Sequence, residues 1–141
     1  MAGRYEFFDH TADVGVRAWA PTLPELVQAA GDGLYAVVGR LVAARETPGR
    51  WLNFEFVGDD DAVLLRDYLA ELLRLLATKR CVVTAIAVEE FSPTRLRVDA
   101  ETRALDLDRS SLEREVKAVT YHQLELRPAA GGYEATFIVD I

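Results

Sequence analysis

The sequence predicts an α+β fold, a two-layer sandwich in which two helices pack on a mixed or antiparallel sheet of about six strands. Two segments, about 22–40 and 60–78, repeat apolar residues at helical spacing. The rest of the chain holds β-branched and apolar runs bounded by turn residues, and the later runs are joined by short turns. A chain of 141 residues that is 50% hydrophobic suits a single domain spanning residues 1–141.

The N-terminal part is predicted to hold a strand followed by a helix. Apolar and other residues alternate over residues 14–20, which predicts a strand that ends at Pro21. Thr22 and Glu25 then have the spacing of a capping box, which predicts a helix N-terminus. The helical repeat comprises Leu26, Ala30, Leu34, Val37, Val38 and Leu41. Gly31 and Gly33 interrupt it, and each weakens a helix by about 1 kcal/mol relative to Ala.

The second helix follows a predicted strand at residues 51–57. Gly58 and the aspartates after it break the strand, offer an N-cap and suit the positive end of a helix dipole. Five leucines then form an apolar stripe, with charged residues on the opposite side. They are Leu65, Leu69, Leu72, Leu73 and Leu76. We expect this stripe to pack into the core.

The C-terminal half is predicted to consist mainly of strands. Residues 81–91 are β-branched and apolar, and residues 94–100 form the second arm of a hairpin. Residues 104–113 are ambiguous. Residues 119–126 and 133–141 predict two further strands around a turn rich in glycine.

Composition excludes several classes of protein. The net charge of −7, from 23 acidic and 16 basic residues, argues against a generic nucleic-acid binder, which needs a basic surface. A single cysteine, Cys81, allows no intrachain disulfide and no multi-cysteine zinc site. No apolar stretch approaches the roughly 18 residues of a membrane span, and the start lacks the apolar stretch of a signal peptide. We therefore expect a cytoplasmic protein with no membrane partner.

Candidate chemistry gathers at residues 9–13, 115–122 and 138–141. A strand that runs to the end of the chain places the Asp140 carboxylate beside the α-carboxylate of Ile141, and such anions repel unless water or a cation neutralises them. Hard divalent ions prefer oxygen ligands of this kind. If the first strand pairs near the last, Asp13 meets Asp140 and a three-carboxylate site for calcium or magnesium results. Alternatively, Asp9 or Asp13 caps a turn and the terminus is simply solvated.

The histidines and one lysine are further candidates. His10 and His122 are the only two histidines, too few for a catalytic zinc site with its usual ligands. A histidine near an aspartate suits general acid–base chemistry, but a structural hydrogen bond is the favoured explanation. Lys117 lies in a polar stretch of strand-like sequence; in a strand, Glu115, Lys117, Val119 and Tyr121 would share one face. A solvated sheet face is the simple alternative.

Three motifs in order resemble the archease family. They are Phe-Asp-His-Thr-Ala-Asp-Val-Gly at residues 8–15, Glu-Val-Lys-Ala-Val-Thr-Tyr-His at residues 115–122, and the terminal Ile-Val-Asp-Ile at residues 138–141. Archeases are small cytosolic proteins that act with the RtcB-type RNA ligase in tRNA splicing and RNA repair. That ligase uses GTP and manganese and passes through a guanylylated histidine. The resemblance implies an activator that promotes guanylylation and multiple turnover and is not itself an enzyme.

The resemblance also implies a set of site residues. In the family a calcium-type divalent metal is bound by the residues that correspond to Asp13, Asp140 and Ile141. Magnesium or manganese would suit the same oxygen ligands. Asp9, His10, Lys117 and His122 are then candidates for supporting the metal ligands or docking the ligase, and RNA is contacted only through the ligase.

Two other classes remain open from the residues alone. A metal-dependent hydrolase could use Asp9, His10, Asp13 and Asp140 around one metal to activate water. A general chaperone or protein-interaction module would depend on an exposed apolar patch, which a single sequence does not reveal.

Overall fold

The computed structural model describes residues 2–10 and 13–141, without the side chains of Asp9 and His10. These residues form two helices and ten strands, so the predicted α+β class is confirmed. The helices are α1 (Leu23–Val38) and α2 (Asp61–Lys79). The strands are β1 (Arg4–His10), β2 (Asp13–Ala20), β3 (Gly39–Arg40), β4 (Arg50–Val57), β5 (Cys81–Phe91), β6 (Arg95–Ala104), β7 (Ser111–Leu112), β8 (Ala118–Val119), β9 (Glu125–Ala129) and β10 (Gly132–Asp140).

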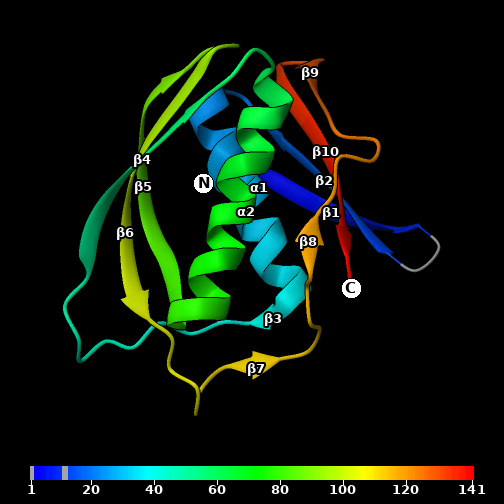
Figure 1. Cartoon of the computed structure of the whole chain (residues 1–141). Helices are drawn as coiled ribbons and strands as arrows, with labels where there is room; N and C mark the ends of the chain where they lie inside the picture. The colour runs from blue at the N-terminus through cyan, green and yellow to red at the C-terminus, as the bar shows by residue number, and fades with distance from the viewer. Residues whose placement is uncertain (1, 11–12) are drawn as a thin grey trace.

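The strands are divided among three antiparallel sheets, where the sequence predicted one. The largest has the order β1-β2-β10-β8, with β9 also paired to β10; the second has the order β4-β6-β5; β3 and β7 form a small third. The helices lie between the two larger sheets (Figure 1). Helix α1 contacts mainly β2 of the large sheet, whereas α2 contacts mainly β4, β5 and β6, and each helix also touches the other sheet. The periodicity of a single segment predicts a strand but does not show to which sheet that strand belongs.

Helix α1 begins where the capping pair predicted. The Glu25 N–H donates to the Thr22 hydroxyl at 3.3 Å, and that hydroxyl donates to the Glu25 carboxylate at 2.8 Å. The two glycines remain helical and buried. A Cβ at position 33 would lie 2.9 Å from a Val16 methyl, so Gly33 lets the helix approach β2 closely. Gly33 therefore serves the packing of α1 on the large sheet, whereas Gly31 faces Leu72 of α2.

Helix α2 carries the predicted leucine stripe into the core. Leu65, Leu69 and Leu72 are at most 1% exposed. The Asp60 carboxylate accepts a hydrogen bond from the Ala62 N–H at 2.9 Å and caps the N-terminus. The helix ends at Arg80, whose φ of 50° is left-handed and whose N–H bonds the Leu75 carbonyl.

Residues 115–126 depart from the prediction. Only Ala118–Val119 and the start of β9 are strands there, and Gln123, with φ of 52°, lies in the turn between them. The prediction that Glu115, Lys117 and Tyr121 share a strand face with Val119 is therefore wrong. Strand β1, which the sequence did not predict, pairs with β2 through its whole length.

Among residues 2–10 and 13–141, the helices are too short or too polar to cross a membrane.

Candidate functional site

The candidate site lies where β2 begins and β10 ends. Strands β2 and β10 pair in antiparallel register, and Asp13 stands directly opposite Asp140. The pairing on which the meeting of the two aspartates depended is therefore present. The neighbouring pair Val14 and Val139 packs into the core. Because side chains alternate along a strand, both carboxylates point to the outer face of the sheet. Directly opposed residues have Cβ atoms about 4.5–5.5 Å apart, and like charges at that spacing destabilise a sheet. The pair is therefore a candidate position for a bound cation.

The polar segment 115–122 is held against the same end of β10. The Lys117 N–H donates to the Asp140 carbonyl at 2.8 Å, and Ala118 lies opposite Asp140 in the β8–β10 pairing. Thr120 donates to the Ile138 carbonyl twice, from its N–H at 2.9 Å and its hydroxyl at 3.0 Å. The His122 N–H in turn donates to the Thr120 hydroxyl at 3.2 Å. The backbone therefore joins two motifs that are far apart in the sequence.

Helix α2 anchors this segment from the other side. Arg66 donates from Nε to the Val119 carbonyl at 2.9 Å, and its guanidinium carbon lies 4.4 Å from the Tyr121 ring centroid. Asp67 pairs with the same guanidinium at 3.1 Å. Tyr121 is still 62% exposed, so its ring forms a supported surface beside the site. Sequence reasoning assigned Arg66 only to the polar side of the helix, because nothing local signals a contact with a residue so distant in the chain.

A glycine shapes the sheet next to the carboxylates. A Cβ at Gly15 would lie 2.2–2.5 Å from three atoms of the Phe8 ring, so that ring occupies the space above β2. The Arg17 guanidinium lies 5.0 Å from the same ring, in cation–π geometry. Ile138, opposite Gly15 in β10, is fully buried. An apolar floor therefore adjoins the opposed aspartates.

The available donors suit a hard cation. Within the described part of the chain, no three His, Cys, Asp or Glu side chains form a group that could hold a metal. The site offers the carboxylates of Asp13 and Asp140, and residue 141, which is 37% exposed, stands beside them. All-oxygen ligands favour calcium or magnesium over zinc, which is usually bound by nitrogen or sulfur ligands. The side chains of Asp9 and His10 lie outside the described residues.

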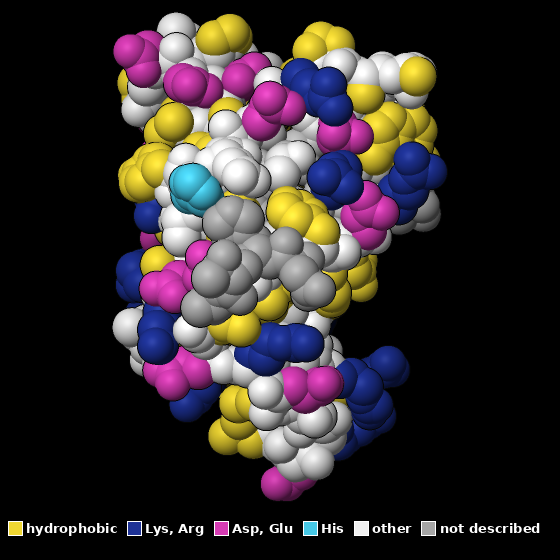
Figure 2. All heavy atoms as spheres, turned by 90° about the vertical axis from the view of Figure 1, so that its right-hand side faces the viewer, with side chains coloured by type: hydrophobic (Ala, Val, Ile, Leu, Met, Phe, Trp, Pro, Cys, Tyr) yellow, Lys and Arg dark blue, Asp and Glu magenta, His cyan; other side chains and the backbone are white. Residues whose placement is uncertain are grey.

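Charge around the site is mixed. Figure 2 shows acidic and basic side chains interspersed over the face on the right-hand side of Figure 1, where β8, β9 and β10 lie. Lys117 and His122 are both exposed. An exposed cation beside opposed carboxylates is the kind of arrangement that orients a charged partner.

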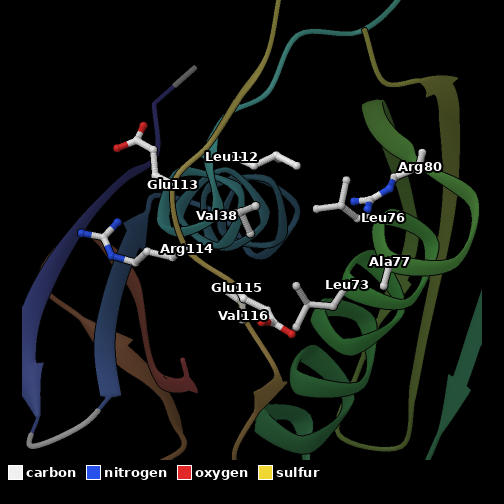
Figure 3. Close-up of a pocket in the computed structure, with 10 residues that line it drawn as sticks. All are labelled: Val38, Leu73, Leu76, Ala77, Arg80, Leu112, Glu113, Arg114, Glu115 and Val116. Carbon is white, nitrogen blue, oxygen red and sulfur yellow. The ribbon is translucent and has the colours of Figure 1, made fainter. Parts of the chain in front are cut away.

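A cavity of about 430 Å³ lies beside the start of the 115–122 segment (Figure 3). The walls mix apolar and polar groups and come from the end of α1, from α2 and from residues 112–116. Val38, Leu73 and Leu76 contribute to them, with the Arg80 side chain at one side. Glu115 and Val116, two residues of the central motif, therefore line a different space from the carboxylate pair.

Comparison with known proteins supports one family. The model of the Archease protein family (MTH1598/TM1083) matches residues 5–141. Protein archease of Methanosarcina barkeri is 32% identical over 98% of this chain and 96% of that protein. Protein archease-like of Drosophila melanogaster is 30% identical over 98% of this chain and 90% of that protein.

Solved structures show the same fold. The solution structure of Methanobacterium thermoautotrophicum protein 1598 matches with a TM-score of 0.72 and 27% identity, over 97% of this chain and 98% of that one. A crystal structure from Thermotoga maritima, described as an archease and possible chaperone, matches with a TM-score of 0.66 over 95% of this chain and 94% of that one. Its 18% identity shows the fold alone.

Proposed function

The chain belongs to the archease family, and from that premise we propose that it is a non-catalytic activator of an RtcB-type RNA ligase in tRNA splicing and RNA repair. The observation that carries the proposal is the pair Asp13 and Asp140, opposed at the end of β10 and bordered by the 115–122 segment. The proposed role is to promote guanylylation of the ligase and to let it turn over repeatedly in the cytoplasm.

We assign the opposed carboxylates to a divalent-cation site. Asp13 and Asp140 would hold the ion together with Ile141, and the Lys117 N–H keeps the end of β10 in place through the Asp140 carbonyl. A bound calcium ion would supply positive charge that the ligase's own acidic ligands can share. Lys117 and His122, both exposed, would dock the ligase, and RNA would be contacted only through it. We assign Asp9 and His10 a role in supporting the metal ligands, because they lie in the same sequence motif as Asp13.

The test is ligation turnover by an RtcB-type ligase with excess RNA, GTP and manganese, with and without this protein. Asp140→Asn and Asp13→Asn should reduce turnover to that of the ligase alone, because each removes a charged ligand but keeps the side-chain volume. Asp59→Asn, an exposed aspartate outside the site, is the matched control and should activate fully. Surface changes of this kind alter the free energy of unfolding by about 0.5 kcal/mol or less, which urea unfolding checks.

A second readout separates the metal from the partner. Calcium should raise the melting temperature of the wild type and the Asp59→Asn variant, since a ligand that binds only the folded state stabilises it. It should have no such effect on Asp140→Asn, or on a chain extended beyond Ile141. Full activation by Asp140→Asn would refute the carboxylate site, and failure of the wild type to activate a cognate ligase would refute the proposed function. Hydrolysis of phosphodiesters by the protein alone, lost in Asp13→Asn, would instead favour a hydrolase.

A chaperone role is the second candidate, and one observation favours it. Leu107, Trp51 and Val57 are each more than half exposed, and exposed apolar groups can bind unfolded clients. The Thermotoga maritima protein of the same fold is described as a possible chaperone. Suppression of aggregation of unrelated proteins without added metal would support this role, and it would be independent of Asp140.

A further inference from the structure

Strand β4 is an open edge of the three-stranded sheet, with Arg50 and Glu55 as its charged residues. Within the described part of the chain it pairs only with β6, and it forms the left-hand border of the molecule in Figure 1. Its eight residues keep an unbroken register and include no proline and no lysine. The opposite edge, β5, has register shifts between Val83 and Ala85 and between Val88 and Glu90. Irregularities of that kind block edge-to-edge pairing, and β4 has none of them.

The free hydrogen-bonding groups of β4 belong to its odd-numbered residues. The Gly58 N–H donates to the Thr94 carbonyl of the neighbouring hairpin at 3.0 Å. Because bonding groups alternate along an antiparallel strand, the even-numbered residues bond β6 and the odd-numbered ones point outward. Trp51, Asn53, Glu55 and Val57 thus present a row of donors and acceptors along the open edge.

The same residues expose apolar side chains in a symmetric arrangement. Trp51 is 55% exposed and Val57 is 69% exposed. Both lie on the outer face of the sheet, and each is three residues from Phe54. A twofold axis through Phe54 would therefore place Trp51 of one strand opposite Val57 of an identical antiparallel strand.

We propose that this edge binds a second copy of the chain, joining two three-stranded sheets into one through antiparallel β4–β4 pairing. In this register Trp51 lies opposite Val57 at both ends, Asn53 lies opposite Glu55, and Phe54 meets its symmetry mate. Leu52 and Phe56, half-buried on the inner face, also come opposite each other. The dimer therefore covers exposed apolar surface on one face and extends the core on the other.

Neighbouring registers are less favourable. A shift of the axis to Glu55 would place two Glu55 carboxylates opposite each other, and a shift to Asn53 would place Trp51 opposite Glu55. Like charges directly opposed destabilise a sheet, whereas an aromatic and a β-branched residue stabilise it by about 0.2–1 kcal/mol per pair. In the proposed register Glu55 also keeps its ion pair with Arg95 at 3.4 Å. The pairing is thus self-complementary in a single alignment.

The test is sedimentation equilibrium of the full chain over a wide range of concentration. The wild type should show a monomer–dimer equilibrium, and Trp51→Lys should weaken the dimer by about tenfold or more, because each substitution occurs twice in the interface. The double variant Trp51→Lys with Val57→Glu should recover much of that loss, since Lys and Glu then face each other. Trp51→Lys with Val57→Lys should be the weakest. Leu107→Lys, at a residue 58% exposed outside β4, is the matched control and should leave the dimer unchanged.

Several outcomes would overturn the proposal. A wild type that stays monomeric throughout would do so, and so would a dimer that Trp51→Lys leaves intact. Equal loss in the two double variants would exclude this register. Circular dichroism of each variant shows that the fold is kept, which is expected because both substituted side chains are more than half exposed. The activation assay above depends on the other end of the molecule, so the two proposals can fail separately.

Discussion

Two tyrosines, the buried Tyr68 and the half-buried Tyr35, illustrate how a single hydroxyl group affects this protein. The Tyr35 hydroxyl accepts a hydrogen bond from the Val83 N–H at 3.0 Å, which ties α1 to β5. Tyr68 as a residue is 2% exposed, and its hydroxyl has no hydrogen-bond partner among the described residues. Burial raises the pKa of both, that of Tyr35 to about 12, although the Val83 bond opposes the shift. The same functional group therefore stabilises the fold at one position and costs free energy at the other.

Phenylalanine substitutions should separate these two cases. Tyr35→Phe should lower the free energy of unfolding by about 1 kcal/mol or more, because it leaves the half-buried Val83 N–H unpaired. Tyr68→Phe should be neutral or stabilising, because it removes a buried group without a protein partner. Urea unfolding at neutral pH checks both. Equal destabilisation by the two changes would contradict this account.

The same experiment at alkaline pH follows from the raised pKa values. An unfolded tyrosine ionises near pH 10, whereas folded Tyr35 ionises at about 12. The stability that depends on the neutral phenol is complete below pH 10 and is lost as the pH rises towards 12, because the unfolded state then binds fewer protons. The loss should be smaller in Tyr35→Phe than in the wild type.

At the scale of elements, α2 is defined by its two ends. Asp60→Ala removes the bond to the Ala62 N–H and should cost about 1 kcal/mol, the usual value for an N-cap. Arg80→Gly should have the opposite effect and stabilise by up to about 1 kcal/mol, because glycine adopts the left-handed φ at the C-cap without strain. Thermal unfolding of the two variants and of the double variant tests this. Additive effects are expected at ends so far apart, and destabilisation by Arg80→Gly would refute the C-cap argument.

The elements also show what local sequence could and could not predict. Both helices were predicted to within two residues, because capping residues and apolar repeats are local signals. The span 119–126 was predicted as one strand, yet only Val119 and the residues from Glu125 pair with β10. That pairing depends on partners far along the chain, as does the unpredicted β1. Local patterns carry no record of such partners.

The candidate site likewise has one part that the sequence predicted and one part that it did not. The sequence predicts that Asp13 and Asp140 meet, because charge is crowded at Asp140 and Asp13 precedes a strand. The β2–β10 register brings the two aspartates opposite each other. The support of Tyr121 by Arg66 was missed, because it joins α2 to a loop about fifty residues later. Adjacent charges can be read from a sequence, whereas contacts made only by the folded chain cannot.

At the scale of the whole molecule, the net charge of −7 bears on partner binding. If the activator docks on a basic surface of the ligase, long-range attraction should speed their association and added salt should screen it. We expect the concentration of this protein needed for half-maximal activation to rise steeply with ionic strength. Titrations at several salt concentrations test this, with turnover of the ligase alone as the reference. An activation midpoint that does not change with salt would show that charge does not steer the encounter.

The position of β10 imposes an order on biosynthesis. This strand lies inside the large sheet, between β2 on one side and β8 and β9 on the other, yet it is the last strand in the chain. During translation, β2 can pair with β1 early, but it can pair with β10 only after all the strands before β10 have left the ribosome. The hairpin of β1 and β2 thus keeps an open edge until β10 emerges, and the Asp13–Asp140 pair forms only after that. A nascent chain truncated before β10 is therefore both unable to close its sheet and devoid of the proposed site.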